Sequence, residues 1–237
     1  MNRILVVVLL ALAAHAGSAT AQALEGEYGA ACANLTSNSL QVQTTQTIPA
    51  NSTIMATAAL SNGFAFSNQV ADPISGVYDN GAIGIGSIIV FPAFHHTAKA
   101  LPSGTTITYS MVGGVGSNAC LTISAFALAA NLINAEASNG GNGATQTLTT
   151  STVTETPNLI YMGVAYAADP GTLTPDLGTM LTKTCGGTAP PLCVAASFRT
   201  ANDLGPFTQT VHSQNSVAWE AALNAFAEDR IFADGFQ

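Results

Sequence analysis

Short runs of β-branched, aromatic and small apolar residues, separated by turn residues, repeat along most of this 237-residue chain. The clearest run covers residues 106–112 (TITYSMV), where Ile107, Tyr109 and Met111 alternate with hydroxyl-bearing residues. Alternation with a period of two is typical of a strand that has one buried face. Many such runs with turn residues between them favour an all-β architecture.

Further runs are consistent with strands at residues 52–60, 87–94, 120–128, 159–167, 192–200 and 207–211. The run 159–167 (LIYMGVAYA) is apolar on both faces, as expected of a central strand covered on both sides. Residues 217–226 (VAWEAALNAF) permit a helix by their alanine content, but their context favours a strand. Residues 138–143 (SNGGNG) are typical of a flexible loop.

No break in composition divides the chain after its N-terminal segment, so we expect one domain. The predicted fold is all-β, an antiparallel β-sandwich of the jelly-roll or immunoglobulin-like kind, over residues 24–227. Residues 228–237 are expected to form a polar C-terminal tail.

The N-terminus has the layout of a secretory signal peptide. Arg3 precedes an unbroken apolar run over residues 4–14, and Ala-x-Ala sites end at Ala21 and Ala23. The run is too short to cross a hydrocarbon core of ~30 Å, which argues against a membrane anchor. We expect residues 1–23 to be removed and the protein to be secreted, to the periplasm, the cell surface or the medium.

Cysteine usage agrees with export. The four cysteines Cys32, Cys120, Cys185 and Cys193 all follow the expected cleavage site. An even number of cysteines in an exported chain predicts disulfides, here with three possible connectivities. Cys185 and Cys193 bracket the loop GGTAPPL and are the favoured pair, which leaves Cys32 for Cys120. A zinc site is disfavoured because no CxxC pair occurs.

The charge balance excludes some partners. Five basic and 13 acidic residues give a formal net charge of -8, and charged residues make up only 8% of the chain. Nucleic acid needs a basic surface, so no nucleic-acid partner is expected. No later apolar stretch is long enough to predict a membrane span after signal cleavage.

The order of segments resembles a loosely defined β-sandwich module of exported and surface proteins of bacteria and of some phage proteins. The similar segments begin at Pro49 (PANSTIMATAALSNG), Val77 (VYDNG), Leu101 (LPSGTTITYSM), Ile123 (ISAFALA), Thr156 (TPNLIYMGVAYA), Val194 (VAASFRTA) and Ser216 (SVAWEAALNAF). The resemblance covers about residues 40–227 and implies a binding or structural module without shared catalytic residues. The double histidine and the Cys185–Cys193 loop depart from that pattern. The ending DRIFADGFQ resembles a short tail on exported proteins of some Gram-negative bacteria.

No motif predicts catalysis. No GxSxG nucleophile elbow occurs, and the glycine runs at 81–86 and 113–116 lack the features of phosphate-binding loops. His95, His96 and His212 remain after cleavage, but neighbours on a strand point to opposite faces, so His95 and His96 would not share a metal.

The acidic residues also lack a pairing pattern. Six of the seven aspartates are scattered, mostly beside Pro or Gly, which is typical of turns rather than of a calcium site: Asp72, Asp79, Asp169, Asp176, Asp203 and Asp234. Glu136, Glu155 and Glu220 are not paired as glycoside hydrolysis requires. We therefore expect no catalytic residues, no metal and no cofactor.

These observations predict a secreted, non-enzymatic β-sandwich protein with a role in binding, adhesion or surface structure. Its expected partner is an extracellular ligand, a glycan or a surface protein. The alternatives are a secreted hydrolase on a β-sandwich scaffold and an assembly subunit of a surface structure.

Overall fold

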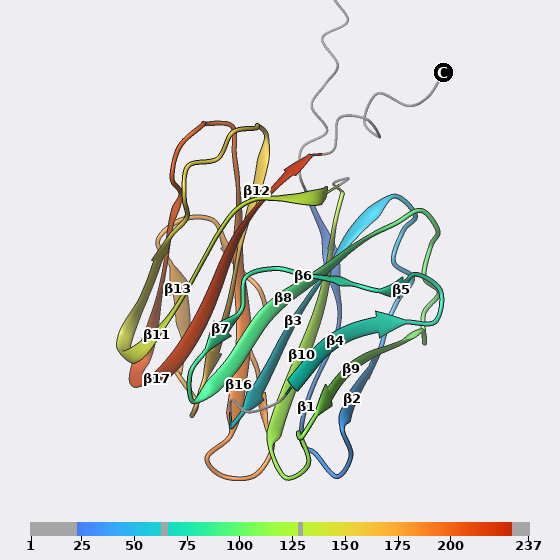
Figure 1. Cartoon of the computed structure of the whole chain (residues 1–237), viewed down its shortest axis with the longest axis vertical. Helices are drawn as coiled ribbons and strands as arrows, with labels where there is room; N and C mark the ends of the chain where they lie inside the picture. Colours follow the sequence, from blue (N-terminus) through green and yellow to red (C-terminus); the bar gives the residue numbers. More distant parts are fainter. Residues whose placement is uncertain (1–22, 63–65, 128–129, 229–237) are drawn as a thin grey trace, which may run out of the picture.

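The computed structural model describes residues 23–62, 66–127 and 130–228, and its regular structure there consists of β-strands alone (Figure 1). Antiparallel strands form three sheets that are stacked as layers in a single domain. The predicted all-β antiparallel sandwich is therefore confirmed. The signal peptide expected at 1–23 lies almost entirely outside the described residues, as does the tail beyond Glu228.

The four-stranded sheet, on the right of Figure 1, has the strand order β2-β9-β4-β5. Its strands are β2 (Ser39–Gln43), β9 (Thr106–Val112), β4 (Phe66–Asp72) and β5 (Gly76–Val77). Strand β9 has the predicted bounds, and Ile107, Tyr109 and Met111 are its buried residues. One face of this sheet is therefore covered, and the other carries the hydroxyl-bearing residues of β9.

The middle sheet has the order β1-β10-β3-β8-β6, with β7 also paired to β8. Its strands are β1 (Leu24–Asn34), β10 (Asn118–Phe126), β3 (Ser52–Ser61), β8 (Ile88–Thr97), β6 (Asp79–Asn80) and β7 (Gly84–Ile85). Both faces of its central strands are buried, so residues 52–60 are buried at every position rather than at every second one. One face packs on the four-stranded sheet, for example through Phe91, whose ring meets Tyr109 edge to face at 5.6 Å.

The opposite face of the middle sheet packs against a third layer. Phe126 of β10 contacts the rings of Tyr161 and Phe198 edge to face, at 6.1 and 4.9 Å between centroids. Small residues allow the two layers to approach, because a Cβ on Gly163 would lie 2.8 Å from Thr57 Cγ2. The Tyr161 hydroxyl is hydrogen-bonded to the Thr57 hydroxyl at 2.7 Å, and burial raises the pKa of Tyr161 to about 12.

This third layer, the curled sheet, has the order β11-β17-β12-β16-β14, with β13 paired to β17 and β15 to β16. Its strands are β11 (Ala130–Thr149), β17 (Thr208–Glu228), β12 (Asn158–Tyr166), β16 (Leu192–Ala201), β14 (Thr179–Met180), β13 (Leu173–Pro175) and β15 (Thr184–Gly186). Strands β11 and β17 change register between Gly143 and Thr145, where four residues of β17 (213–216) lie opposite the single residue Ala144 of β11. The pair bends there and turns back over the sheet, so that Leu148 and Val211 pack with Ile160 and Val164 of β12.

Most predicted strands are confirmed, with two differences in the curled sheet. The segments 207–211 and 217–226 belong to one long strand, β17, and the ambiguous second segment is a strand rather than a helix. The flexible loop predicted at residues 138–143 is wrong, because these residues lie inside β11 and pair with β17. Gly140 faces Glu220 across the ladder, where a Cβ would lie 2.3 Å from the Glu220 carboxylate and a larger side chain would not fit, whereas Gly141 faces Trp219 at an ordinary contact distance.

The four cysteines form the two expected pairs, Cys32–Cys120 and Cys185–Cys193, and no described cysteine is free. Cys32 and Cys120 are directly opposite each other on β1 and β10, as Cys185 and Cys193 are on β15 and β16. Two disulfides indicate an oxidising, non-cytoplasmic environment. Among the described residues, no helix meets the length and hydropathy needed to span a membrane.

Candidate functional site

The bent part of the curled sheet presents an array of hydroxyl groups to solvent. Alternation along β11 and β17 buries Gln146, Leu148, Gln209 and Val211 and turns their neighbours outward. Strand β13 continues the array, because Thr174 lies opposite His212. The resulting hydroxyl face consists of eight side chains, all exposed except the half-buried Thr210: Thr145, Thr147, Thr149, Thr174, Asp176, Thr208, Thr210 and His212.

Cross-strand hydrogen bonds order this face. Thr147 Oγ1 lies 3.1 Å from Thr210 Oγ1, and Thr149 Oγ1 lies 2.8 Å from Thr208 Oγ1. Both pairs are directly opposite in the ladder, so their Cβ atoms are held close by the backbone. The β-branched side chains have few rotamers, and the hydroxyl positions are therefore fixed before any ligand arrives.

One corner of the hydroxyl face brings together a hydroxyl, an imidazole and a carboxylate. Thr145 Oγ1 lies 3.3 Å from His212 Nδ1, and His212 Nε2 lies 2.8 Å from Asp176 Oδ1. These are the group types of a nucleophile, a base and an orienting acid. The His212 and Asp176 side chains are 46% and 56% exposed, so water reaches the whole chain of contacts. His212 and Asp176 were considered separately in the sequence analysis, and the contact between them was not predicted.

The double histidine does not form a shared site. His95 stacks on the Tyr78 ring at 5.5 Å, whereas Nδ1 of His96 lies 3.5 Å from Thr53 Oγ1. The two imidazoles thus point to opposite faces of β8, as the strand geometry predicts. Both are half-buried at the end of this strand.

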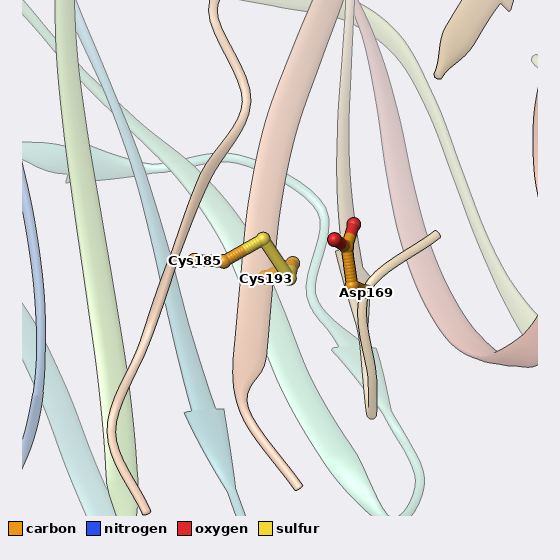
Figure 2. A group of neighbouring side chains, drawn as sticks. All are labelled: Asp169, Cys185 and Cys193. Carbon is orange, nitrogen blue, oxygen red and sulfur yellow. A yellow bond between two sulfur atoms is a disulfide. The ribbon is translucent and has the colours of Figure 1, made fainter. Parts of the chain in front are cut away.

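Asp169 lies beside the Cys185–Cys193 disulfide, with ligand atoms close enough for a metal site (Figure 2). The two sulfurs are bonded to each other, which removes the thiolates that would bind a metal. Asp169 is also engaged by Lys183, whose Nζ donates to Oδ1 at 2.5 Å. This donated hydrogen bond lowers the pKa of Asp169. The cluster is therefore a poor metal site in its disulfide form.

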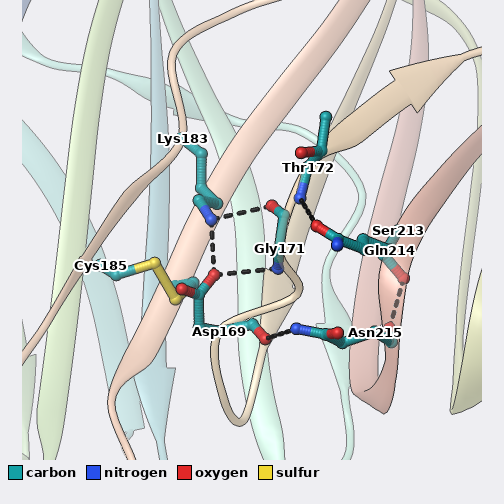
Figure 3. Close-up of polar contacts among 9 residues, drawn as sticks. Asp169, Gly171, Thr172, Lys183, Cys185, Ser213, Gln214 and Asn215 are labelled. Atoms are coloured by element: carbon teal, nitrogen blue, oxygen red, sulfur yellow. Dashed lines mark hydrogen bonds and ion pairs between the residues drawn. A yellow bond between two sulfur atoms is a disulfide. The ribbon is translucent and has the colours of Figure 1, made fainter.

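Asp169 also belongs to a network of hydrogen bonds that connects neighbouring segments of the curled sheet (Figure 3). Lys183 Nζ also donates to the carbonyl of Gly171 at 2.8 Å, and Asn215 Nδ2 donates to the carbonyl of Asp169. Gln214 exchanges two hydrogen bonds with the backbone of Thr172. These contacts join the β12–β13 connection to the bend of β17. An open cavity of about 460 Å³ lies here, lined by Gly171, Thr172, Leu173, Met180, Leu181, Lys183 and Gln214.

A second cavity, of about 320 Å³, lies against the loop that the Cys185–Cys193 disulfide closes. Its wall is formed by Ser61, Asn62, Ser87, Ile88, Gly116, Asn118, Ala167, Thr188, Ala189, Pro190, Pro191 and Leu192. Asn118 is buried and donates from Nδ2 to the carbonyls of Thr188 and Pro190. Its Oδ1 accepts from the Thr188 backbone and from Asn34. Both ends of the Asn118 amide are therefore engaged in hydrogen bonds that hold the loop in place. No ionisable side chain is among the residues that line this cavity.

Among the carboxylates of the curled sheet whose burial the structure describes, Glu220 is the most enclosed, at 9% exposed. It is wedged between two glycines, because a Cβ on Gly140 would lie 2.3 Å from its Oε1 and one on Gly86 closer still. Desolvation by burial raises the pKa of Glu220, since the charged form loses hydration. Glu136 and Glu155, in contrast, are exposed.

Replacing Glu220 by Gln is expected to stabilise the protein at pH 7 to 8. A carboxyl whose pKa is raised on folding contributes full stability below its unfolded pKa and loses it as the pH rises through the folded pKa. The amide keeps the shape and removes the buried charge, so the free energy of unfolding should increase by about 1 kcal/mol at neutral pH. Urea denaturation of both proteins at pH 3.5 and at pH 7.5 measures this.

The gain in the Glu220→Gln protein should vanish at pH 3.5, where the wild-type carboxyl is protonated. Glu155→Gln, at an exposed position, is the control and should leave stability unchanged at both pH values. An equal effect of Glu220→Gln at the two pH values would show that shape, and not charge, is responsible.

The remaining aspartates behave largely as turn residues. Asp72 Oδ1 accepts from the backbone nitrogens of Ile74 and Ser75, and Asp169 Oδ1 accepts from that of Gly171. Asp72 Oδ2 also accepts from the Tyr78 hydroxyl at 2.9 Å. Desolvation by burial raises the pKa of this tyrosine, and the charge of Asp72 and its hydrogen bond raise it further. Asp234 lies outside the described residues.

That the residues of the hydroxyl face form one group was not predicted from the sequence. The signal is present in the two strings TQTLT (145–149) and TQTVH (208–212), in which an outward polar residue alternates with a buried one. Either string alone indicates only a strand. Their alignment depends on the register of β11 with β17, which no local pattern contains.

Comparisons with protein-family models, with curated proteins and with solved structures found no match.

Proposed function

We propose that the protein is exported and acts outside the cytoplasm as a non-enzymatic binding protein, with the layered sheets as a rigid scaffold and the hydroxyl face as its contact surface. The observation that carries the proposal is the ordered, exposed array of Thr hydroxyls on the bent part of the curled sheet. Exposed side chains fixed in place lose little entropy on binding. The two disulfides and the signal-like N-terminus support export.

A secreted hydrolase is the second candidate, because Thr145, His212 and Asp176 form a continuous chain of polar contacts. This chain lies on an open face, and the two cavities described above are lined by other residues. Acyl transfer also needs preorganised donors for the oxyanion in a water-excluded site. An open sheet face provides no such enclosure, which favours binding over catalysis.

The test combines a binding assay with a hydrolysis assay on the purified full-length protein. Beads coated with the protein are expected to adhere to extracellular surfaces, such as immobilised cell-wall and matrix preparations, more than beads coated with albumin. Ester, phosphoester, glycoside and peptide substrates should show no turnover above that of the His212→Ala variant.

Turnover that is lost in the His212→Ala variant would replace the binding proposal by the hydrolase. Failure to adhere to any extracellular preparation, together with no turnover, would contradict a contact role for this surface.

A further inference from the structure

The hydroxyl face offers a balanced set of hydrogen-bond donors and acceptors. In each Thr–Thr pair one hydroxyl donates to the other, which leaves one O–H donor and several acceptor lone pairs directed to solvent. The face thus presents both kinds of group side by side at Thr147–Thr210 and at Thr149–Thr208. The natural complement is a ligand whose own groups donate and accept at once, which is the property of sugar hydroxyls.

The composition of the face argues against other macromolecular partners. Its eight side chains include no Lys, Arg, Phe, Tyr or Trp. Phosphate-rich or other anionic polymers need basic groups, and the centres of protein interfaces favour aromatic residues and Arg. Its two titratable side chains, His212 and Asp176, contact each other. A neutral partner is therefore the best match in charge.

The spacing of the face is regular in two directions. Neighbouring strands lie about 4.8 Å apart, and outward residues on one strand repeat about every 6.7 Å. Three outward positions on each of β11 and β17, with Thr174 and Asp176 beside them, give an area of roughly 10 by 13 Å. An open, regularly spaced surface suits an extended polymer that repeats its hydroxyl groups, rather than a small molecule that needs a concave pocket.

We propose that the hydroxyl face binds a neutral polysaccharide, laid flat across the outer strands and held by hydroxyl–hydroxyl contacts with Thr147, Thr149, Thr208 and Thr210. This inference rests on the proposed function in binding and specifies the class of its ligand. Each contact is weak because water competes for it, so retention depends on many contacts along an insoluble polymer.

The experiment measures depletion of the full-length protein from solution by suspensions of cellulose, chitin and insoluble β-1,3-glucan, with alginate beads as the anionic comparison. The wild-type protein is expected to bind at least one neutral polymer and to bind alginate less. The Thr147→Val/Thr210→Val variant should bind that polymer about tenfold more weakly, because valine keeps the shape and removes the hydroxyls.

Two further variants control for folding and position. Thr147→Ser/Thr210→Ser keeps the hydroxyls and should retain binding. Thr106→Val/Thr108→Val removes two hydroxyls from the outer face of β9, in the four-stranded sheet, and should also retain binding. Circular dichroism and melting curves identify any variant that does not fold.

Several outcomes would overturn the inference. These are no binding to any neutral polymer, binding to alginate alone, or equal binding by wild type and a folded Thr147→Val/Thr210→Val variant. Adhesion of coated beads to extracellular preparations would still support the proposed function in those cases, so the two failures are distinguishable.

Discussion

Removing the Cys32–Cys120 disulfide by a double Ala substitution is expected to lower the free energy of unfolding by about 4–5 kcal/mol. The cysteines are 88 residues apart, and in the chain-entropy treatment a loop of this length restricts the unfolded chain strongly. For a domain of this size the melting temperature should fall by roughly 10–20 °C. Thermal and urea denaturation of the two proteins measure the change.

The matched control is the Cys185→Ala/Cys193→Ala protein. Its cysteines are only eight residues apart, so the same reasoning gives a loss of about 2.5 kcal/mol. The long-range pair should therefore matter more than the local pair. Equal losses, or reactive thiols in the native wild-type protein, would contradict this account of the disulfides.

Replacing Phe126 by Ala is expected to cost about 3–5 kcal/mol, a large fraction of the stability of a typical domain. Phe126 is fully buried between the middle and curled sheets, where its ring meets Tyr161 and Phe198. The substitution leaves a cavity between two sheets whose backbones cannot both relax to fill it. Urea denaturation gives the free energy directly.

Val112→Ala, in the four-stranded sheet, provides the comparison. Val112 is apolar but 56% exposed at the end of β9, so its truncation should change stability by no more than about 0.5 kcal/mol. A Phe126→Ala loss as small as this would show that the third layer does not pack as described.

The strands that the sequence predicts best are those whose burial is decided by their own alternation. In β9 every second residue is apolar, and the burial of the strand follows that pattern position by position. After Asn158, strand β12 has no charged or amide side chain, and it is covered on both faces by the middle sheet and by the bent part of the curled sheet. The local sequence was sufficient to predict both strands, because a strand with one covered face alternates polar and apolar residues whereas a strand with two covered faces is apolar on both.

The curled sheet was less predictable because its form depends on contacts between distant segments. Residues 138–143 resemble a loop in composition, yet they form a strand that pairs with β17. Glycine is tolerated at position 140 of this strand because only glycine leaves room for the Glu220 side chain. The contact between His212 and Asp176 likewise depends on the pairing of β13 with β17. Such long-range register is set by the whole sheet rather than by any short stretch of sequence.

Strand β17 is the last strand of the described chain, yet it lies inside the curled sheet between β11 and β12. A chain synthesised or translocated with its N-terminus first must therefore deliver residue 228 before this layer can close. Until then β12 lacks one neighbour, and its apolar face stays open to water. Completion of the third layer is thus the final event of vectorial folding, and loss of the C-terminal strand would leave two finished sheets beside an unclosed one.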